Sequence, residues 1–507
     1  MFIPPLQRKS RVIRFRFGTC SVLLLALAHP TRGSAQATDA DVARLIAAML
    51  GDTPLLRDVA RLTDRFGGRA TGSEANIKAV EWGLLQFREA GVEARAEPFT
   101  MPGLWLERSA TATIGGTPLP FSPRVAALPF SAATPAAGVA APMLDGATGD
   151  SATFAALGDR VRGAWILVEQ EELRDIDGLF REYARSGQIE ARAWRAGARG
   201  IVYMGSRPNN LLYRHNLNLD FGNRERLGLV MERDGALRAL RLLRDGVPLT
   251  LTAVLDLETG PAYQSSNVIG EIRGSSKPDE IVLIGAHYDS WDLGTGALDN
   301  GANAMMVLDI ARQIRRLGIR PSRTVRFALW NGEEQGLRGS LGYTHSHAAE
   351  LDRHVMTTSI DIGTGRITGF FTGGRPEILP AVEQALVPVA GLGPFTQVDL
   401  PIVGTDNFDF MMEGVAHLVA NQEAANYGPN YHARSDEFGQ VDGQQLRLNA
   451  AIIAAMTLRF AEMPVTWRRQ SRADIERMVA GSDLRQQMES MGIWQEWRSG
   501  ARGRKRP

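Results

Sequence analysis

The sequence has almost no cysteine. Its 507 residues include one, Cys20, which lies in an N-terminal segment that we expect to be removed. A mature chain without cysteine forms no disulfide, offers no thiolate to a metal and has no cysteine nucleophile. Any metal site in this protein must therefore use histidine, aspartate and glutamate.

The sequence also lacks an excess of charge of either sign. Its formal net charge is +1 at pH 7, with 44% hydrophobic and 22% charged residues. A nearly neutral chain gives no reason to expect a nucleic-acid partner, and this balance of residues argues against a disordered chain. The length is sufficient for roughly two to four domains.

The N-terminus has the pattern of a targeting segment. A basic start is followed by the apolar run Ser21–Ala28 and by Ala35-Gln36-Ala37, an A-x-A cleavage site. The apolar run is too short to span a bilayer, which takes roughly 20 residues. We predict a signal peptide over residues 1–37, export to the periplasm or the extracellular space, and no stable membrane span after cleavage. An uncleaved membrane anchor is the alternative reading.

Two common hydrolase motifs are absent, namely the H-E-x-x-H helix and the G-x-S-x-G turn. Instead, three apolar runs each end in residues that can bind a metal or move a proton. Ile281–Ala286, Thr324–Trp330 and Val355–Ile360 are the expected strands. The polar residues that follow them are His287 and Asp289, Glu333 and Glu334, and Asp361.

A helix is expected between the first two strands. It begins at Asp299-Asn300-Gly301, and Ala304, Val307, Leu308 and Ala311 recur at helical spacing. Alternating strands and helices predict an α/β fold with a mostly parallel central sheet flanked by helices. Right-handed crossovers place the strand C-termini at one edge, where ligands bind.

The polar residues at these strand ends should therefore converge with Asp299. Five carboxylates and one imidazole would then share one place. Buried like charges repel, and unpaired burial costs several kcal/mol per ion. A divalent cation is the simplest group that would stabilise such a cluster.

The remaining segments suggest how the chain is divided. Residues 38–108 and 263–465 are assigned to a discontinuous catalytic domain. Residues 109–262 contain short strands, helices and one isolated histidine, His215; we expect an inserted, β-rich α+β domain that shapes the cleft, with a separate catalytic unit as the alternative. For residues 466–507 we predict a surface helix and a solvated basic end. The basic residues of this end are Arg498, Arg502, Arg504, Lys505 and Arg506.

Several single features have ordinary structural readings. His345 and His347 form an H-x-H that we interpret as surface histidines. Gly294 and Gly296 are not a dinucleotide fingerprint, because Asp299 stands where the third glycine should be. Asp299-Asn300-Gly301 by itself is typical of a turn. Only the ordered set of motifs favours a catalytic site.

Five strings carry a resemblance to a known family. They are HYDSWD, ALDNGAN, WNGEEQG, SIDIG and YHARSDE, in this order. In these strings the chain resembles the co-catalytic zinc exopeptidases, the family of bacterial leucyl aminopeptidase and glutamate carboxypeptidase II, and within it the carboxypeptidase Q group. The resemblance extends from Asp39 to about Met463. The block at 109–262 is similar to that family's protease-associated domain.

The resemblance implies a ligand set for two zinc ions, with manganese or cobalt as substitutes that the same donors suit. Asp299 would bridge both ions. One ion would also be held by His287 and Asp361, and the other by Glu334 and His432.

The resemblance also implies catalytic roles. Glu333 would be the general base that takes a proton from a water bridging the two metals and later gives it to the leaving amine. Asp289 would orient His287 through its ring N–H. Tyr427 or Tyr431 would stabilise the oxyanion.

The implied activity is hydrolysis of dipeptides or of the N-terminal residues of peptides by an exported zinc exopeptidase. Two alternatives share the fold: a glutaminyl cyclase-like enzyme with one zinc ion, and a catalytically inactive binding protein. Side-chain specificity, the choice between aminopeptidase and dipeptidase, the physiological metal and the oligomeric state, including a homodimer, are left open.

Overall fold

The protein is described from a computed structural model, which covers residues 37–215 and 226–505. The predicted signal peptide, with Cys20, lies outside the described residues except for Ala37. Within these ranges, no helix combines the length and apolar character that crossing a membrane requires.

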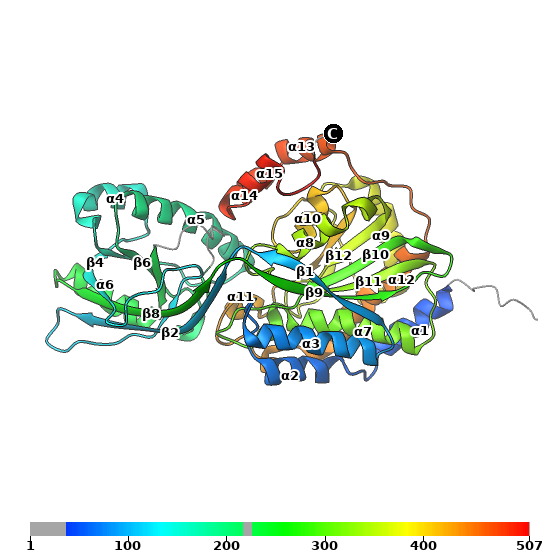
Figure 1. Ribbon diagram of the computed structural model, residues 1–507, viewed down its shortest axis with the longest axis horizontal. Helices are drawn as coiled ribbons and strands as arrows, with labels where there is room; N and C mark the ends of the chain where they lie inside the picture. The colour runs from blue at the N-terminus through cyan, green and yellow to red at the C-terminus, as the bar shows by residue number, and fades with distance from the viewer. Residues whose placement is uncertain (1–36, 216–225, 506–507) are drawn as a thin grey trace, which may run out of the picture. The chain divides into compact units, whose positions relative to one another are not determined.

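A seven-stranded sheet forms the centre of the larger lobe (Figure 1). Its four middle strands are parallel, and the strands toward both edges are antiparallel. The predicted parallel sheet is therefore confirmed in the middle of the sheet, where strands are buried on both faces. The strand order is β1 (Glu93–Met101), β9 (Tyr263–Ile272), β11 (Arg323–Trp330), β10 (Lys277–His287), β12 (His354–Ser359), β14 (His417–Gln422) and β13 (Ile367–Phe371).

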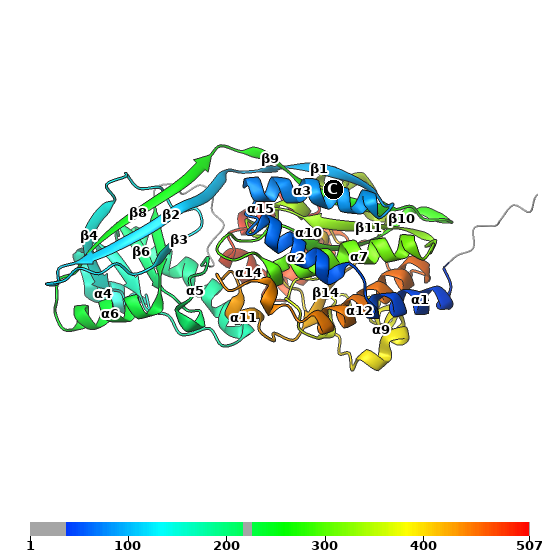
Figure 2. The same ribbon diagram turned by 90° about the horizontal axis from the view of Figure 1, so that it is seen from below.

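Helices cover both faces of this sheet (Figures 1 and 2). Alternate residues of β10 point to opposite faces, so Val282 and Ile284 pack on one side and Leu283 on the other. The first face is covered by α1 (Asp39–Leu50), α2 (Leu55–Phe66), α3 (Glu74–Glu89), α7 (Ala302–Arg316), α9 (Leu379–Leu386) and α12 (Gly443–Glu462). The second is covered by α8 (Arg338–Ser346) and α10 (Asn407–Met412).

A second seven-stranded sheet is built from residues 104–260. The chain enters it directly after β1 and returns directly into β9. The strand order is β2 (Leu104–Gly115), β8 (Thr250–Gly260), β4 (Val139–Asp145), β5 (Trp165–Val168), β6 (Gly200–Met204), β7 (Leu227–Met231) and β3 (Val125–Ala127). Its helices are α4 (Ser151–Leu157), α5 (Ile176–Arg195) and α6 (Arg233–Arg244). We call this part the inserted lobe; its status as a protease-associated domain stays a prediction.

The C-terminal segment differs from its prediction. It forms three short helices, α13 (Arg472–Ala480), α14 (Leu484–Ser490) and α15 (Trp494–Ser499), which share an apolar cluster with Leu337. Arg498 and Lys505 are exposed, as expected for a basic end. Arg502 is fully buried, so the expectation of a solvated end is wrong at this residue.

Buried Arg502 has partners that its local sequence does not reveal. Its Nη2 donates to the Gly336 carbonyl at 2.9 Å, and its Nε lies 3.2 Å from Asp409 Oδ1. A buried guanidinium is tolerated when carboxylates and carbonyl oxygens surround it. The C-terminal segment is thereby fixed to the loop that follows Glu334.

Replacing Arg502 with methionine should destabilise the protein. The change leaves the carboxylate of Asp409 buried without its cation, which typically costs about 3–5 kcal/mol. Urea denaturation measures the free energy of unfolding. Arg498→Met, an exposed arginine of the same segment, is the matched control and should change it by less than about 0.5 kcal/mol. Equal effects of the two substitutions would contradict this account of the buried arginine.

Candidate metal centre

Three strands of the central sheet deliver side chains to one edge. His287 is the last residue of β10, Glu333 and Glu334 follow β11, and Asp361 follows β12. The strands are parallel and in register, with His287 beside Trp330 of β11. Because parallel strands end at the same edge, residues far apart in the sequence meet there.

Two further elements complete the cluster. Asp299 lies in the turn Ala297–Gly301, directly before α7, and its peptide bond to Asn300 is cis. His432 lies after the short helix α11 (Tyr427–Asn430) and has a positive φ of 56°.

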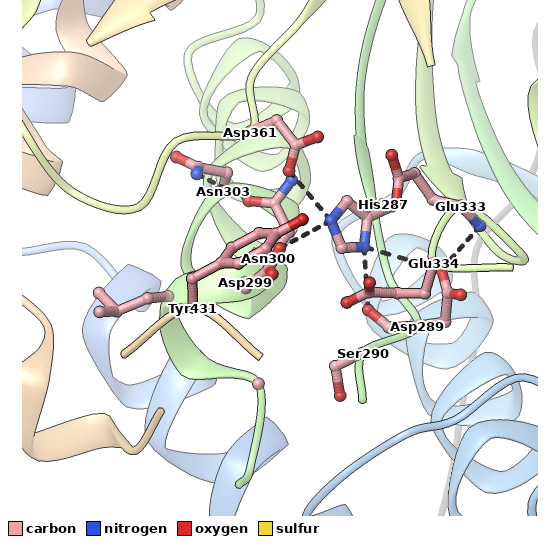
Figure 3. A network of polar contacts seen from close by, with 12 residues as sticks. His287, Asp289, Ser290, Asp299, Asn300, Asn303, Glu333, Glu334, Asp361 and Tyr431 are labelled. Carbon is pink, nitrogen blue, oxygen red and sulfur yellow. Dashed lines mark hydrogen bonds and ion pairs between the residues drawn. The ribbon is translucent and has the colours of Figure 1, made fainter. Parts of the chain in front are cut away.

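The candidate ligands form two groups that share Asp299. His287 Nε2 lies 3.1 Å from Asp299 Oδ1 and 3.0 Å from Asp361 Oδ1 (Figure 3). His432 Nε2 lies 2.8 Å from Glu334 Oε2 and 3.5 Å from Asp299 Oδ2. Within each group one donor atom per residue lies within 4.8 Å of the others. The structure therefore brings these five side chains together.

The cluster holds more negative charge than its burial allows. Burial raises the pKa of Glu334 well above its usual value, and the carboxylate of Asp299 adds to the effect. Burial likewise raises the pKa of Glu333, with the carboxylates of Asp361 and Glu334 adding to the rise while His287 opposes it. For His287, burial lowers the pKa, but Asp361 and Glu333 outweigh it and the pKa is raised.

His432 tests whether these residues fit a metal ion. Its Nδ1 lies 3.2 Å from the Arg214 carbonyl oxygen, which can only accept, so we assign the proton to Nδ1. Burial lowers the pKa of His432 to about 4, which leaves the ring neutral and Nε2 without a proton near pH 7. A bare nitrogen facing two carboxylates is stabilised by a cation between them.

Unpartnered oxygens support the same fit. Glu334 Oε1 and Asp361 Oδ1 are buried and accept no hydrogen bond from the residues that the structure describes. Nitrogen and carboxylate donors of this kind suit zinc. The donor set therefore fits a metal ion in each group, held by His287, Asp299 and Asp361 or by Asp299, Glu334 and His432.

Asp289 contacts the ring of His287 mainly through its main chain. The closest partner of His287 Nδ1 is the main-chain carbonyl of Asp289, at 3.0 Å, and the carboxylate Oδ1 is 3.7 Å away. The Asp289 carboxylate accepts from Thr71 Oγ1 at 2.7 Å and from the Glu333 N–H at 3.3 Å. Asp289 thus positions both His287 and the loop that carries Glu333.

The two tyrosines proposed for the oxyanion lie beside the ligands. The Tyr431 ring stacks on His432, with ring centroids 3.7 Å apart. Its hydroxyl is 2.7 Å from that of Tyr183, on α5 of the inserted lobe. Tyr427 lies beside Asp299 and contributes to lowering the pKa of its carboxyl, against the effect of burial. Tyr183 was not predicted, because no motif lies near it in the sequence.

Residues without an assigned role in the sequence hold the turn around Asp299. Asp436 accepts from the N–H groups of Leu298 and Asp299 at 2.6 and 3.1 Å. Asn300 Nδ2 donates to the Ile360 carbonyl at 2.8 Å, which ties the turn to the strand end before Asp361. Both residues stand inside the motif strings, and that position was the one available signal.

The loop between α2 and α3 contributes as well. Buried Arg69 donates to the carbonyls of Tyr288, Thr295 and Gly296 at 2.8, 2.6 and 2.9 Å. Gly296 has a φ of 61°, and a Cβ there would lie 2.3 Å from the Ser290 Cβ. This close approach explains why residue 296 is a glycine, and a role in nucleotide binding is not needed to explain it.

Comparison with known proteins agrees with the site. Residues 267–457 match the model of peptidase family M28. The structure superposes with a TM-score of 0.77 on the crystal structure of a peptidase M28 precursor from Shewanella amazonensis SB2B, at 27% identity over 85% of this chain and 98% of that one. The matched part of the chain is a peptidase family M28 domain. The protein is accordingly an enzyme, a metallo-exopeptidase.

Other relatives of this M28 peptidase agree over most of its length. Human carboxypeptidase Q is 26% identical over 409 residues, which cover 80% of this chain and 84% of the relative. The zinc aminopeptidase BSAP from Bacillus subtilis shares the fold with a TM-score of 0.63, at 18% identity over 79% of this chain and 93% of that one.

In the metal-free M28 peptidase, Glu334→Gln should raise stability. Burial and Asp299 raise the pKa of Glu334 in the folded chain, so ionising it costs free energy that the unfolded chain does not spend. The increase in the free energy of unfolding over wild type should grow as the pH rises above 4.5, the pKa of this glutamate in the unfolded chain. Chelator-treated protein is compared by urea denaturation from pH 5 to 8, with the exposed Asp352→Asn as control. A gain that shrinks with rising pH would contradict the assignment.

Proposed function

We propose that this M28 peptidase is an exported exopeptidase with two zinc ions that hydrolyses dipeptides or removes N-terminal residues from peptides. The observation that carries the proposal is the pair of donor groups that share Asp299. Its similarity to carboxypeptidase Q and to a zinc aminopeptidase supports peptide substrates and zinc.

In this proposal the chain holds each ion with one imidazole and carboxylates. His287 and Asp361 complete one group, His432 and Glu334 complete the other, and Asp299 belongs to both. Zinc ions, when bound, lower the pKa of water and polarise a carbonyl group. The main-chain carbonyls of Asp289 and Arg214 keep the two rings in the tautomer that leaves Nε2 free.

Glu333 is the proposed general base. Its side chain is partly exposed, in contrast to buried Glu334, so water and substrate can reach it. Glu333 takes a proton from the attacking water as the oxygen adds to the carbonyl carbon. It returns that proton to the amine nitrogen as the carbon–nitrogen bond breaks. Tyr427 and Tyr431 are the proposed donors to the carbonyl oxygen.

The glutaminyl cyclase-like alternative needs only one ion. The two donor groups favour two ions, because His287 and Asp361 would otherwise leave a second buried acidic group without a cation. Ammonia release from an N-terminal glutamine would instead indicate a cyclase.

We also propose export through the segment 1–37 and a role for residues 109–262 as an inserted protease-associated domain. The basic start, short apolar run and A-x-A site support export. The separate sheet of residues 104–260 supports the inserted domain.

Metal removal should abolish peptidase activity. Purified protein is treated with 1,10-phenanthroline and dialysed, then given zinc or cobalt, and the products of a dipeptide and a longer peptide are read by mass spectrometry. We expect release of a free amino acid that is lost on chelation and recovered with metal. Acetylating the substrate N-terminus should block release. Full activity in protein shown to be metal-free would refute the proposal.

Glu333→Gln should lower kcat by orders of magnitude while bound zinc stays unchanged, because the amide cannot accept the proton. Exposed Glu423→Gln is the matched control and should keep the wild-type rate. Zinc content by mass spectrometry and single-turnover rates are measured on the same samples. A near-normal rate for Glu333→Gln would show that another group is the base.

A further inference from the structure

One candidate ligand, His432, is held by the inserted lobe. The segment Leu212–Arg214 of that lobe runs beside the loop 431–434. The Arg214 N–H donates to the His432 carbonyl at 3.0 Å, and the Arg434 N–H donates to the Leu212 carbonyl at 3.0 Å. Tyr213 and Ala433 form an antiparallel bridge between them. Main-chain pairing thus fixes the backbone on both sides of the His432 ring.

His432 needs this support because of its own backbone. A φ of 56° is unfavourable for a residue with a side chain. Such a conformation persists only where its surroundings impose it. The ring is also oriented from the inserted lobe, since its Nδ1 lies 3.2 Å from the Arg214 carbonyl oxygen.

The Arg214 side chain fixes the supporting segment. Its guanidinium, 1% exposed, makes a bidentate contact with Asp292 at 2.8 and 2.9 Å. Nη1 donates to Glu107 Oε2 at 2.6 Å and to the Ala127 carbonyl at 3.0 Å. Asp292 belongs to the loop after β10, whereas Glu107 and Ala127 belong to β2 and β3. One buried guanidinium therefore joins the inserted lobe to the loop beside the metal ligands.

The other ligand group is held by different contacts. His287 is oriented by the Asp289 carbonyl in its own loop. Asn303 Nδ2 donates to Asn300 Oδ1 and to the Gly363 carbonyl at 2.7 and 3.0 Å, which links the Asp299 turn to the loop after Asp361. These supports come from α7, the turn before it and the loops that follow β10 and β12.

We propose that Arg214 is a positioning residue through which the inserted lobe controls one of the two ions. The ion held by Asp299, Glu334 and His432 depends on this arginine, whereas the ion held by His287, Asp299 and Asp361 does not. This inference rests on the proposed two-ion site, and the experiment below separates the failure of one from the failure of the other.

The test uses Arg214→Met in the full chain. Zinc binding is measured by equilibrium dialysis, and the bound zinc is counted. Removing contacts that orient a ligand typically weakens metal binding 10–100-fold. We therefore expect the zinc affinity to fall about tenfold or more for one ion and to stay unchanged for the other. Arg244→Met is the matched control. Arg244 also joins two carboxylates, Asp145 and Glu169, at 2.8 and 2.7 Å within the same lobe, and both affinities should stay at wild-type values.

Double variants identify the weakened ion. Glu334→Ala removes a ligand from the group that depends on Arg214. Adding Arg214→Met to this variant should therefore lower the zinc affinity little further. Asp361→Ala removes a ligand from the other group, so adding Arg214→Met should weaken both ions. Equal loss in both backgrounds would overturn the assignment of Arg214 to the His432 group.

The remaining outcomes are also decisive. If wild type binds two ions and Arg214→Met binds both with unchanged affinity, the inference is wrong and the proposed function stands. If wild type binds fewer than two ions, both are wrong. If circular dichroism shows that Arg214→Met does not fold, Asp292→Asn takes its place, because it removes the same bidentate ion pair with little change in side-chain volume. Asp292→Asn must then lower the zinc affinity of the His432 group alone.

Discussion

The carboxylate of Asp299 is the group on which the rest of the site depends, because it belongs to both donor sets. Three segments hold its turn from different directions. Asp436 accepts from its main-chain N–H, Asn300 donates to the end of the strand before Asp361, and Arg69 donates to the carbonyls before the turn. Such redundancy is what a cluster of like charges requires, since repulsion would otherwise spread the ligands apart.

Buried arginines frame this acidic centre. Arg69, Arg214 and Arg502 are almost fully buried. Arg69 and Arg502 donate to main-chain carbonyls of loops beside the site, and Arg214 donates to the carboxylate of Asp292 in such a loop. A guanidinium stays charged and has no lone pair for a metal. It can therefore offset the negative charge of neighbouring loops and fix their backbone without competing for the ion, which a lysine or histidine in the same place could do.

Much of the candidate site was predictable because its signals are local. An apolar run followed by His287 or Asp361 marks a strand end, and the rule that parallel strands end at one edge brings these residues together. The supports were not predictable. The contact between Arg214 and His432, like that between Arg502 and Gly336, joins segments that lie far apart in the sequence. No periodic pattern of residues marks such a contact. The contact of His287 with the Asp289 carbonyl depends on the path of one turn, which residue types alone do not specify.

The contacts of His432 connect metal binding with the inserted lobe in a way that constrains both. Tyr431, stacked on His432, shares a hydrogen bond with Tyr183 of α5, and Arg207 Nε donates to the Tyr431 carbonyl at 3.0 Å. A substitution that shifts α5 would therefore also shift Tyr431 and the candidate ligand His432 on which it stacks. The position of this candidate ligand is thus coupled to the inserted lobe through side-chain as well as main-chain contacts.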